Sequence, residues 1–244
     1  MRVELLGAGI DCVDLAGAVE KVKDMVAGGK PGHVVTLNPE ILYRARNEPG
    51  LLELINRADL VTADGVGIVW AARMAGTPLP GRVAGIDLLE ELSALAARRR
   101  WPVFLLGAAP GVARDAVARL AQRHTGLLVA GTHHGFFGPD EEEGVVRTIA
   151  QSGAILLFAG MGAPRQERFI AAHLAELAVP VAMGVGGCLD VLAGRVKRVG
   201  PFLRRLHLEW LGRLLREPSR WRRALVLPRY AALVLVRYGF LRRR

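Results

Sequence analysis

Val103-Phe104-Leu105-Leu106 is the stretch that decides the fold class, together with the turn Gly107-Ala108-Ala109-Pro110-Gly111 and the segment Val112-x-x-x-Ala116-Val117-x-x-Leu120. Four consecutive apolar residues predict a strand that is buried on both faces, and the apolar spacing of 112–120 predicts an amphipathic helix. A strand, a glycine turn and a helix in this order form the repeating unit of a parallel sheet.

The same alternation recurs on both sides of this unit. Similar apolar runs are Val34-Val35-Thr36-Leu37, Leu60-Val61-Thr62, Ile155-Leu156-Leu157-Phe158 and Val181-Ala182-Met183. Each is followed by a polar or glycine turn and then by helical spacing, as in Leu88-Leu89-x-x-Leu92-x-x-Leu95. The sequence therefore predicts an α/β, Rossmann-like fold: a mostly parallel sheet with helices on both faces.

The composition is that of a folded protein in a reducing compartment. Of the 244 residues, 51% are hydrophobic, which is enough to build a core and excludes a disordered chain. Two cysteines, Cys12 and Cys188, are too few for a disulfide framework. The N-terminus has Glu4 beside two leucines and lacks the apolar core of a signal peptide. We therefore expect a cytoplasmic protein.

The charge is concentrated at the C-terminal end. The net charge is +10, but residues 195–244 alone carry +13, from fourteen Arg and one Lys against two Glu, which leaves −3 on residues 1–194. The same fifty residues hold six aromatic side chains. We therefore divide the chain into a Rossmann-like core at residues 1–194 and a basic, largely helical appendage at residues 195–244.

A basic segment rich in aromatic residues, Leu and Val suits either an anionic membrane surface or nucleic acid. Its longest uncharged run is split by Arg229 into residues 224–228 and 230–236. Neither piece approaches the roughly 20 residues that are needed to span a bilayer. We therefore expect the appendage to lie on a membrane without crossing it.

Candidate site residues lie in the turns after the predicted strands, because ligands of open α/β sheets bind at the carboxyl ends of the strands. In Thr36-Leu37-Asn38-Pro39, Asn38 either caps the helix that starts at Pro39 or contacts a ligand. In Ala63-Asp64-Gly65, Asp64 is either a turn or cap residue or a catalytic carboxylate.

Three further turns are rich in glycine. Residues 107–111 either cradle a phosphate or form a tight turn, and they match neither the Walker loop nor the dinucleotide spacing. In residues 160–167, Gln166 and Glu167 either reach a ligand or cap the backbone. In residues 184–190, the glycines allow close approach of a nucleotide, and Asp190 either binds its base or ribose or caps a helix.

Several chemistries lack the residues that they need. The sequence has no Asp-x-Asp to bridge a nucleotide diphosphate through a metal ion, and no Gly-x-Ser-x-Gly elbow. His133 and His134 are adjacent, so on a strand they would face opposite ways and form no metal pair. We expect no metal and no cofactor, and a leaving phosphate neutralised by helix N-termini and arginines.

Two blocks of residues are specific enough to indicate a family. They are Gly162-Ala163-Pro164-Arg165-Gln166-Glu167 and Leu208-Glu209-Trp210-Leu211 with Arg213 and Glu217-Pro218. They are accompanied in order by Thr36-Leu37-Asn38-Pro39-Glu40, Asp64-Gly65-x-Gly67-Ile68-Val69, Arg82-x-x-Gly85-x-Asp87-Leu88, Phe104-Leu105-Leu106-Gly107, His134-Gly135-Phe136-Phe137, and Gly184-Val185-Gly186-Gly187 with Asp190. In this order, from about Thr36 to Arg223, the sequence resembles the WecG/TagA/CpsF glycosyltransferases.

The resemblance implies a metal-independent, inverting transfer of a sugar from a UDP-sugar to a polyprenyl-diphosphate-linked N-acetylglucosamine at the inner face of the cell membrane. In the teichoic-acid branch of the family the donor is UDP-N-acetylmannosamine. In the enterobacterial-antigen branch it is the corresponding uronate. The first of these is our main functional prediction.

The resemblance also implies roles for individual residues. Asp64 matches the proposed general base of the family. The residues that match the substrate pocket are Thr36, Asn38, Arg82 and Gln166, and those that match an appendage closing over the site are Arg213, Arg220 and Arg223. Asp190 matches a residue near the nucleotide, and we assign further nucleotide contacts to Gly107, Phe136, Gly162 and Gly186.

Three alternatives stay open at this point. The first is a nucleic-acid-binding protein whose basic end contacts phosphates, although the Leu and Val content and the glycine turns speak against nucleic acid as the partner. The second is an inactive protein of the membrane surface. The third is a family member with another donor, such as UDP-glucose or UDP-N-acetylmannosaminuronate. The oligomeric state is also open, because an apolar tail can pack on lipid or on a second copy.

Overall fold

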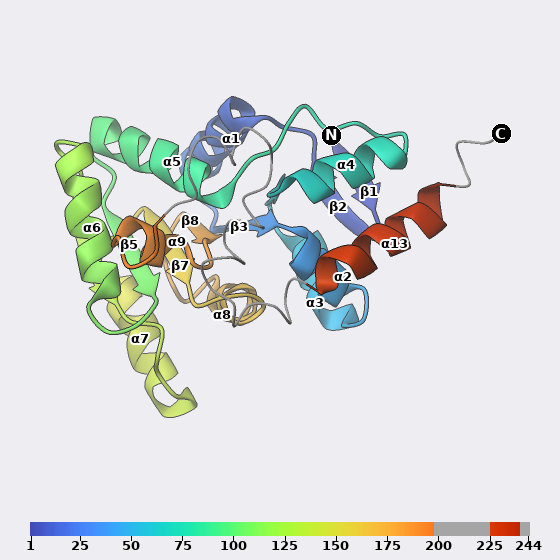
Figure 1. The fold of residues 1–244 in the computed structure, drawn as a ribbon. Helices are drawn as coiled ribbons and strands as arrows, with labels where there is room; N and C mark the ends of the chain where they lie inside the picture. The colour runs from blue at the N-terminus through green and yellow to red at the C-terminus, as the bar shows by residue number, and fades with distance from the viewer. Residues whose placement is uncertain (198–224, 240–244) are drawn as a thin grey trace.

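The protein is built around one six-stranded sheet (Figure 1). The structure, a computed structural model, describes residues 1–197 and 225–239. The strands lie in the order β4-β3-β8-β7-β5-β6, and every neighbouring pair is parallel. Their bounds are β3 Gly32–Leu37, β4 Leu60–Ala63, β5 Val103–Gly107, β6 Val129–His133, β7 Leu156–Gly160 and β8 Val181–Gly184. The predicted α/β class with a parallel sheet is confirmed.

Five of the six strands are buried along their whole length, as their unbroken apolar runs predict. The sixth, β6, lies at an edge of the sheet, and its residues are half-buried or exposed. The sequence Val129-Ala130-Gly131-Thr132-His133 lacks a continuous apolar run. For that reason β6 was not among the predicted strands.

Helices cover both faces of the sheet. Alternate strand residues point to opposite faces, so each face carries apolar side chains that must be buried. Val34 belongs to the core cluster of one face, and its neighbour Val35 to a cluster of the other. The first face is covered by α1 Leu15–Ala27, α5 Gly85–Arg99, α6 Val112–Arg123 and α9 Cys188–Leu192. The second is covered by α2 Pro39–Ala45, α3 Pro49–Arg57, α4 Val66–Met74, α7 Pro139–Gln151 and α8 Arg165–His173.

A short N-terminal hairpin, β1 Arg2–Leu5 and β2 Ala8–Asp11, packs beside β4. Its anchor is Asp11, a buried carboxylate that accepts from Arg2 Nε at 3.0 Å, Lys21 Nζ at 2.6 Å and the Val61 N–H at 2.9 Å. A buried carboxylate is tolerated only when it is paired and hydrogen-bonded in this way. Asp11 therefore ties the hairpin to the sheet edge.

The last described helix, α13 Val226–Tyr238, returns to the body and lies beside α2 and α4 (Figure 1). Tyr230 and Val234 are buried in the same core cluster as residues of β3 and β4. The Tyr238 hydroxyl accepts from the Leu6 N–H at 2.9 Å. This part of the predicted appendage thus shares a core with residues 1–194, and the division of the chain at residue 194 stays a prediction.

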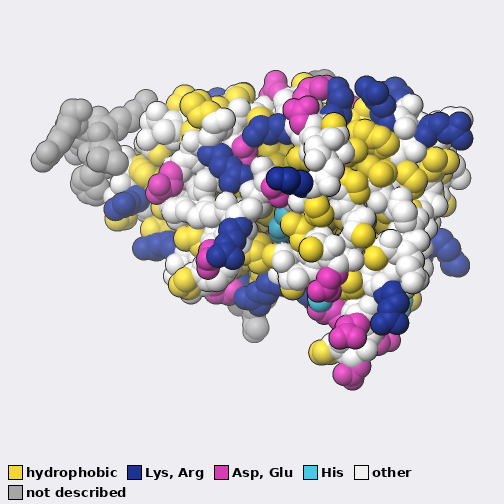
Figure 2. Space-filling model, turned by 180° about the vertical axis from the view of Figure 1, so that it is seen from behind, with side chains coloured by type: hydrophobic (Ala, Val, Ile, Leu, Met, Phe, Trp, Pro, Cys, Tyr) yellow, Lys and Arg dark blue, Asp and Glu magenta, His cyan; other side chains and the backbone are white. Residues whose placement is uncertain are grey.

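Charge separates the two ends of the described body. Asp140, Glu141 and Glu142 lie in the first turn of α7, and Figure 2 shows acidic side chains gathered where that helix projects from the molecule. α13 lies at the opposite end and exposes Arg229 and Arg237.

Within residues 1–197 and 225–239, no helix combines the length and the apolar character that crossing a membrane requires.

We predict that Tyr230→Ala lowers the free energy of unfolding by about 3–5 kcal/mol, because a large side chain with 2% exposure leaves a cavity when it is truncated. Tyr230→Phe is the matched control. It removes only a hydroxyl that lies 3.4 Å from the Gly67 carbonyl oxygen, so it should cost below about 1 kcal/mol. Urea unfolding measures both. Equal small losses would show that α13 contributes nothing to the core.

We predict a second stability effect from His33, which is 3% exposed on β3 and whose Nε2 atom has no partner among the described residues. Burial lowers its pKa from 6.5 to about 4. Between these values the unfolded chain binds a proton that the folded chain does not, so stability falls as pH falls, by about 3 kcal/mol in all. His33→Leu should lack this loss. Parallel curves for both proteins in urea unfolding between pH 7 and 4 would contradict the prediction.

Candidate active site

Thr36 connects the carboxyl ends of β3 and β8. Its hydroxyl donates to the Gly184 carbonyl oxygen at 3.1 Å. Gly85, the first residue of α5, packs against the same side chain, because a Cβ at position 85 would come within 3.2 Å of Thr36 Oγ1. The start of α5 therefore lies directly beside the ends of these two strands.

Asp64 lies at the end of β4, next to this contact. Its Oδ2 atom accepts from the Gly85 N–H at 3.3 Å, and its own N–H donates to the Leu37 carbonyl oxygen at 2.8 Å. The carboxylate is half-buried. It does not cap α4, whose N-cap residue is Gly65. Asp64 therefore does not cap the helix that follows it in the sequence, but its carboxylate accepts from the first N–H of α5.

Asn38 and Arg82 lie on either side of Asp64. Asn38 caps α2, since its Oδ1 atom accepts from the Ile41 N–H at 3.0 Å, which confirms the capping interpretation. The Nη2 atom of Arg82 lies 3.8 Å from the Oδ2 atom of Asp87. The segment that carries Arg82 runs beside β4, because the next N–H, that of Val83, donates to the Ala63 carbonyl oxygen at 2.9 Å.

Gln166, near the start of α8, joins the two glycine turns that follow β7 and β8. Its Oε1 atom accepts from the Gly162 N–H at 3.1 Å and from the Gly186 N–H at 2.9 Å. Its Nε2 atom donates to Glu167 Oε1 at 2.8 Å. The side chain is 2% exposed. Of the two sequence interpretations, the one that has Gln166 bonded to the backbone is thus realised.

Gly107 ends β5 in close contact with β7. Its φ is +136°, and a Cβ there would come within 2.3 Å of the Gly160 carbonyl oxygen, so only glycine fits. The next residue, Ala108, donates its N–H to that oxygen at 3.0 Å and accepts from the Gly135 N–H at 2.9 Å. The loop after β6 is therefore held against the turn after β5.

Phe136 extends from this loop with 71% of its surface exposed. The loop is fixed by Arg165, whose guanidinium donates to the carbonyl oxygens of Gly135 at 2.7 Å and Phe137 at 2.8 Å. The same guanidinium lies 4.7 Å from the centre of the Phe137 ring. Arg165 thus positions an exposed aromatic ring at the carboxyl edge of the sheet.

The structure brings most of the predicted site residues to one edge of the sheet. These are Thr36, Asn38, Asp64, Arg82, Gly107, Phe136, Gly162, Gln166 and Gly186, with Asp190 in the first turn of α9. Arg213, Arg220 and Arg223 lie outside the described residues. Two further residues matter for the edge: Arg165 was not among the predicted candidates, and Glu167 was a candidate to which no role was assigned. Both stand in the block 162–167, so their place beside Gln166 was the available signal.

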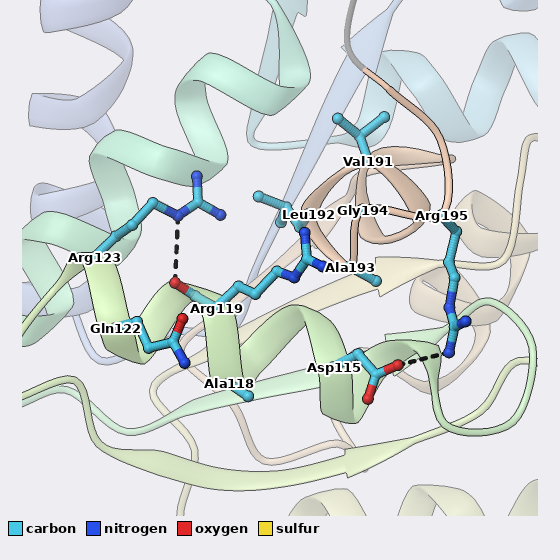
Figure 3. A pocket seen from close by; sticks show the side chains of 10 residues that line it. All are labelled: Asp115, Ala118, Arg119, Gln122, Arg123, Val191, Leu192, Ala193, Gly194 and Arg195. Atoms are coloured by element: carbon cyan, nitrogen blue, oxygen red, sulfur yellow. Dashed lines mark hydrogen bonds and ion pairs between the residues drawn. The ribbon is translucent and has the colours of Figure 1, made fainter.

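A separate cavity of about 890 Å³ lies between α6 and α9 (Figure 3). Its charged lining includes Arg119, Arg123 and Arg195, and Arg195 pairs with Asp115 at 2.7 Å between Nη2 and Oδ2. None of the predicted site residues lines it. This cavity therefore lies apart from the predicted site residues, which gather at the strand ends.

We predict that Gly107→Ala lowers the free energy of unfolding by about 3 kcal/mol or more, because the new Cβ meets backbone and the φ angle is unsuited to alanine. Gly111→Ala is the control, since its φ is +85° but nothing lies within 4 Å of its Cβ. It should cost about 1 kcal/mol. Equilibrium unfolding compares the two, and equal costs would disprove the close contact of β5 with β7.

Comparison with known proteins places the chain in a family. The glycosyl transferase WecG/TagA/CpsF family matches residues 3–244. Proteins named N-acetylglucosaminyldiphosphoundecaprenol N-acetyl-beta-D-mannosaminyltransferase are 38% identical to it: that of Bacillus spizizenii W23 over 84% of this chain and 79% of the relative, and that of Staphylococcus aureus MW2 over 91% and 86%. The chain therefore belongs to the WecG/TagA/CpsF family of glycosyl transferases.

Proposed function

We propose that the protein is an inverting glycosyltransferase. In this proposal it moves N-acetylmannosamine from UDP-N-acetylmannosamine to polyprenyl-diphosphate-linked N-acetylglucosamine and forms a β-linkage, as the synthesis of a teichoic acid linkage unit requires. The names of the similar proteins support the sugar and the acceptor. The structural observation that carries the proposal is the half-buried carboxylate of Asp64, held by the Gly85 N–H beside Thr36 at the carboxyl edge of the sheet.

In the proposed reaction, Asp64 acts as general base. The acceptor hydroxyl oxygen attacks the anomeric carbon of the donor from the face opposite UDP, and its proton passes to the carboxylate. The bond from the anomeric carbon to the phosphate oxygen breaks as the new bond forms, and its electron pair leaves with UDP. A carboxylate is a weak base, so the proton transfers late, when the new bond has largely formed.

The proposal assigns the sugar and diphosphate contacts to the surrounding polar groups. The cap on α2 uses Asn38 Oδ1, so the Nδ2 group is the part of that side chain that would donate to a sugar hydroxyl. Arg82 completes the proposed pocket, and the buried side chains of Thr36 and Gln166 would form its supporting wall. Helix N-termini at the strand ends, together with Arg213, Arg220 and Arg223, would stabilise the negative charge of the departing diphosphate.

The nucleotide would lie against the turns after β5, β7 and β8. Phe136 offers an exposed ring on which a base can stack, at the edge that also carries Gly107 and Gly162. Asp190 follows the glycines of the last turn and would accept a hydrogen bond from the base or ribose, close to Gly186. These roles form the nucleotide part of the proposal.

The proposal also places the protein on the inner face of the cell membrane. On α13 and at its start, Leu225, Leu235 and Val236 are exposed, and so are Arg229 and Arg237. Apolar side chains flanked by arginines suit an interface of lipid and anionic headgroups. A membrane-bound position brings the site to an acceptor whose lipid tail stays in the bilayer.

We predict that Asp64→Asn lowers kcat by about 10²–10⁴-fold, the usual contribution of a general base, and leaves UDP binding unchanged. UDP release from UDP-N-acetylmannosamine with a soluble lipid-diphosphate-N-acetylglucosamine analogue measures kcat, and calorimetry with UDP measures binding. Asp140→Asn, an exposed acid on α7, is the control and should keep wild-type turnover. Near-normal turnover of Asp64→Asn would exclude this residue as the base.

The same assay decides between the remaining functional alternatives. Turnover with UDP-glucose or UDP-N-acetylmannosaminuronate, and none with UDP-N-acetylmannosamine, would support the same type of reaction with a different donor. The protein would then act in a different biosynthetic pathway. Absence of turnover with every UDP-sugar, combined with salt-dependent DNA binding, would favour the nucleic-acid alternative. Acceptor-dependent release from UDP-N-acetylmannosamine supports the proposal as stated.

A further inference from the structure

Gln166 acts as a clamp between two turns that are 24 residues apart along the chain, at Gly162 and Gly186. One amide oxygen accepts both N–H groups, at 3.1 Å and 2.9 Å. Rotation of the amide by 180° would point its NH₂ group at these two donors and break both bonds. The clamp therefore works in one of the two amide orientations only.

The opposite end of the amide is bonded to Glu167. Gln166 Nε2 donates to Glu167 Oε1 at 2.8 Å, and in the rotated orientation two oxygen atoms would face each other there. Glu167 thus favours the same orientation that the two turns require. The bond between neighbouring side chains is buried, where a hydrogen bond is stronger than in water.

Glu167 is a carboxyl group with 0% exposure, and its Oε2 atom has no hydrogen-bond partner among the described residues. Burial raises the pKa of this carboxyl above its usual value, which favours the neutral form. A group without solvent contact cannot exchange protons with a substrate directly. Its Oε1 atom instead bonds the neighbouring side chain of Gln166.

The fold makes room for this pair at Gly184. A Cβ at position 184 would come within 2.7 Å of Gln166 Nε2 and 3.2 Å of Glu167 Oε1. The carbonyl group of the same glycine accepts from Thr36 Oγ1. The pair therefore sits against the strand end that also fixes a predicted pocket residue.

We propose that Glu167 is a positioning residue, which locks the Gln166 amide in the orientation that clamps the turns at Gly162 and Gly186 together. The inference deepens the proposed function, on which its kinetic part rests, because those turns carry proposed nucleotide contacts. Without the lock, the two turns separate more freely and the donor binds more weakly. The chemical step at Asp64 is affected less.

The orientation can be tested without turnover, since the chain has only three glutamines, Gln122, Gln151 and Gln166. In protein labelled with ¹⁵N at the glutamine side chains, we expect one NH₂ pair that exchanges slowly with solvent and disappears in Gln166→Met. In Glu167→Leu this pair should exchange at least about tenfold faster, as expected for the loss of one buried hydrogen bond. Unchanged exchange would overturn the lock.

The kinetic arm uses the same variants. In Glu167→Leu the KM for the UDP-sugar should rise about tenfold, while kcat changes less than about threefold. Glu167→Gln keeps an oxygen acceptor at the same place and should restore both the exchange rate and the KM. Glu91→Leu, a change of an exposed acid on α5, is the control for the substitution itself and should match the wild type.

Folding is followed by thermal unfolding of each variant, and Glu167→Met, with an unbranched side chain, replaces Glu167→Leu if the latter does not fold. A KM that is unchanged in the apolar variant, or equally raised in Glu167→Gln, would overturn the inference. If the wild type turns over no UDP-sugar but the exchange results hold, the proposed function fails and the lock stands.

Discussion

The structure depends on one constraint: strands that are predominantly apolar on both faces must be covered on both faces. Covering both faces requires helices between the strands, and helical crossovers make the strands parallel. All six strands then end at the same edge of the sheet. This is why that edge brings together Thr36, Asp64 and Gln166, although the first and the last are 130 residues apart in the sequence. The chemistry of the edge follows from the pattern that builds the core.

The apolar pattern was sufficient to predict five strands but not the whole fold. β3, β4, β5, β7 and β8 are buried on both faces, so their sequences carry the signal directly. β6 is an edge strand and needs no apolar run, and the N-terminal hairpin depends on Asp11, whose partners are set by tertiary contacts. The packing of α13 against α2 could not be predicted either, because the apolar spacing of a helix does not indicate which surface it packs against.

The site was predictable turn by turn, while its connections were not. Each turn follows a predicted strand, so the region of Asp64 and Gln166 could be located from sequence. The bond from Thr36 to Gly184 spans 148 residues, and the sequence gives no sign of it. The choice between a ligand contact and a backbone contact for Gln166 also depends on burial, which is a property of the packed fold. The predicted roles of Arg213, Arg220 and Arg223 fall outside the described residues.

Burial separates two kinds of polar group at this edge. Thr36, Gln166 and Glu167 are buried and bonded to other parts of the protein, whereas Asp64 is half-buried. A group that receives a proton from a substrate must be reachable, and it must release that proton before the next turnover. A group that fixes geometry gains from a dry environment, since hydrogen bonds are stronger there and competing water is excluded. The edge therefore combines a buried framework that sets distances with a half-buried carboxylate, and in the proposed function this framework restricts where a donor can bind relative to Asp64.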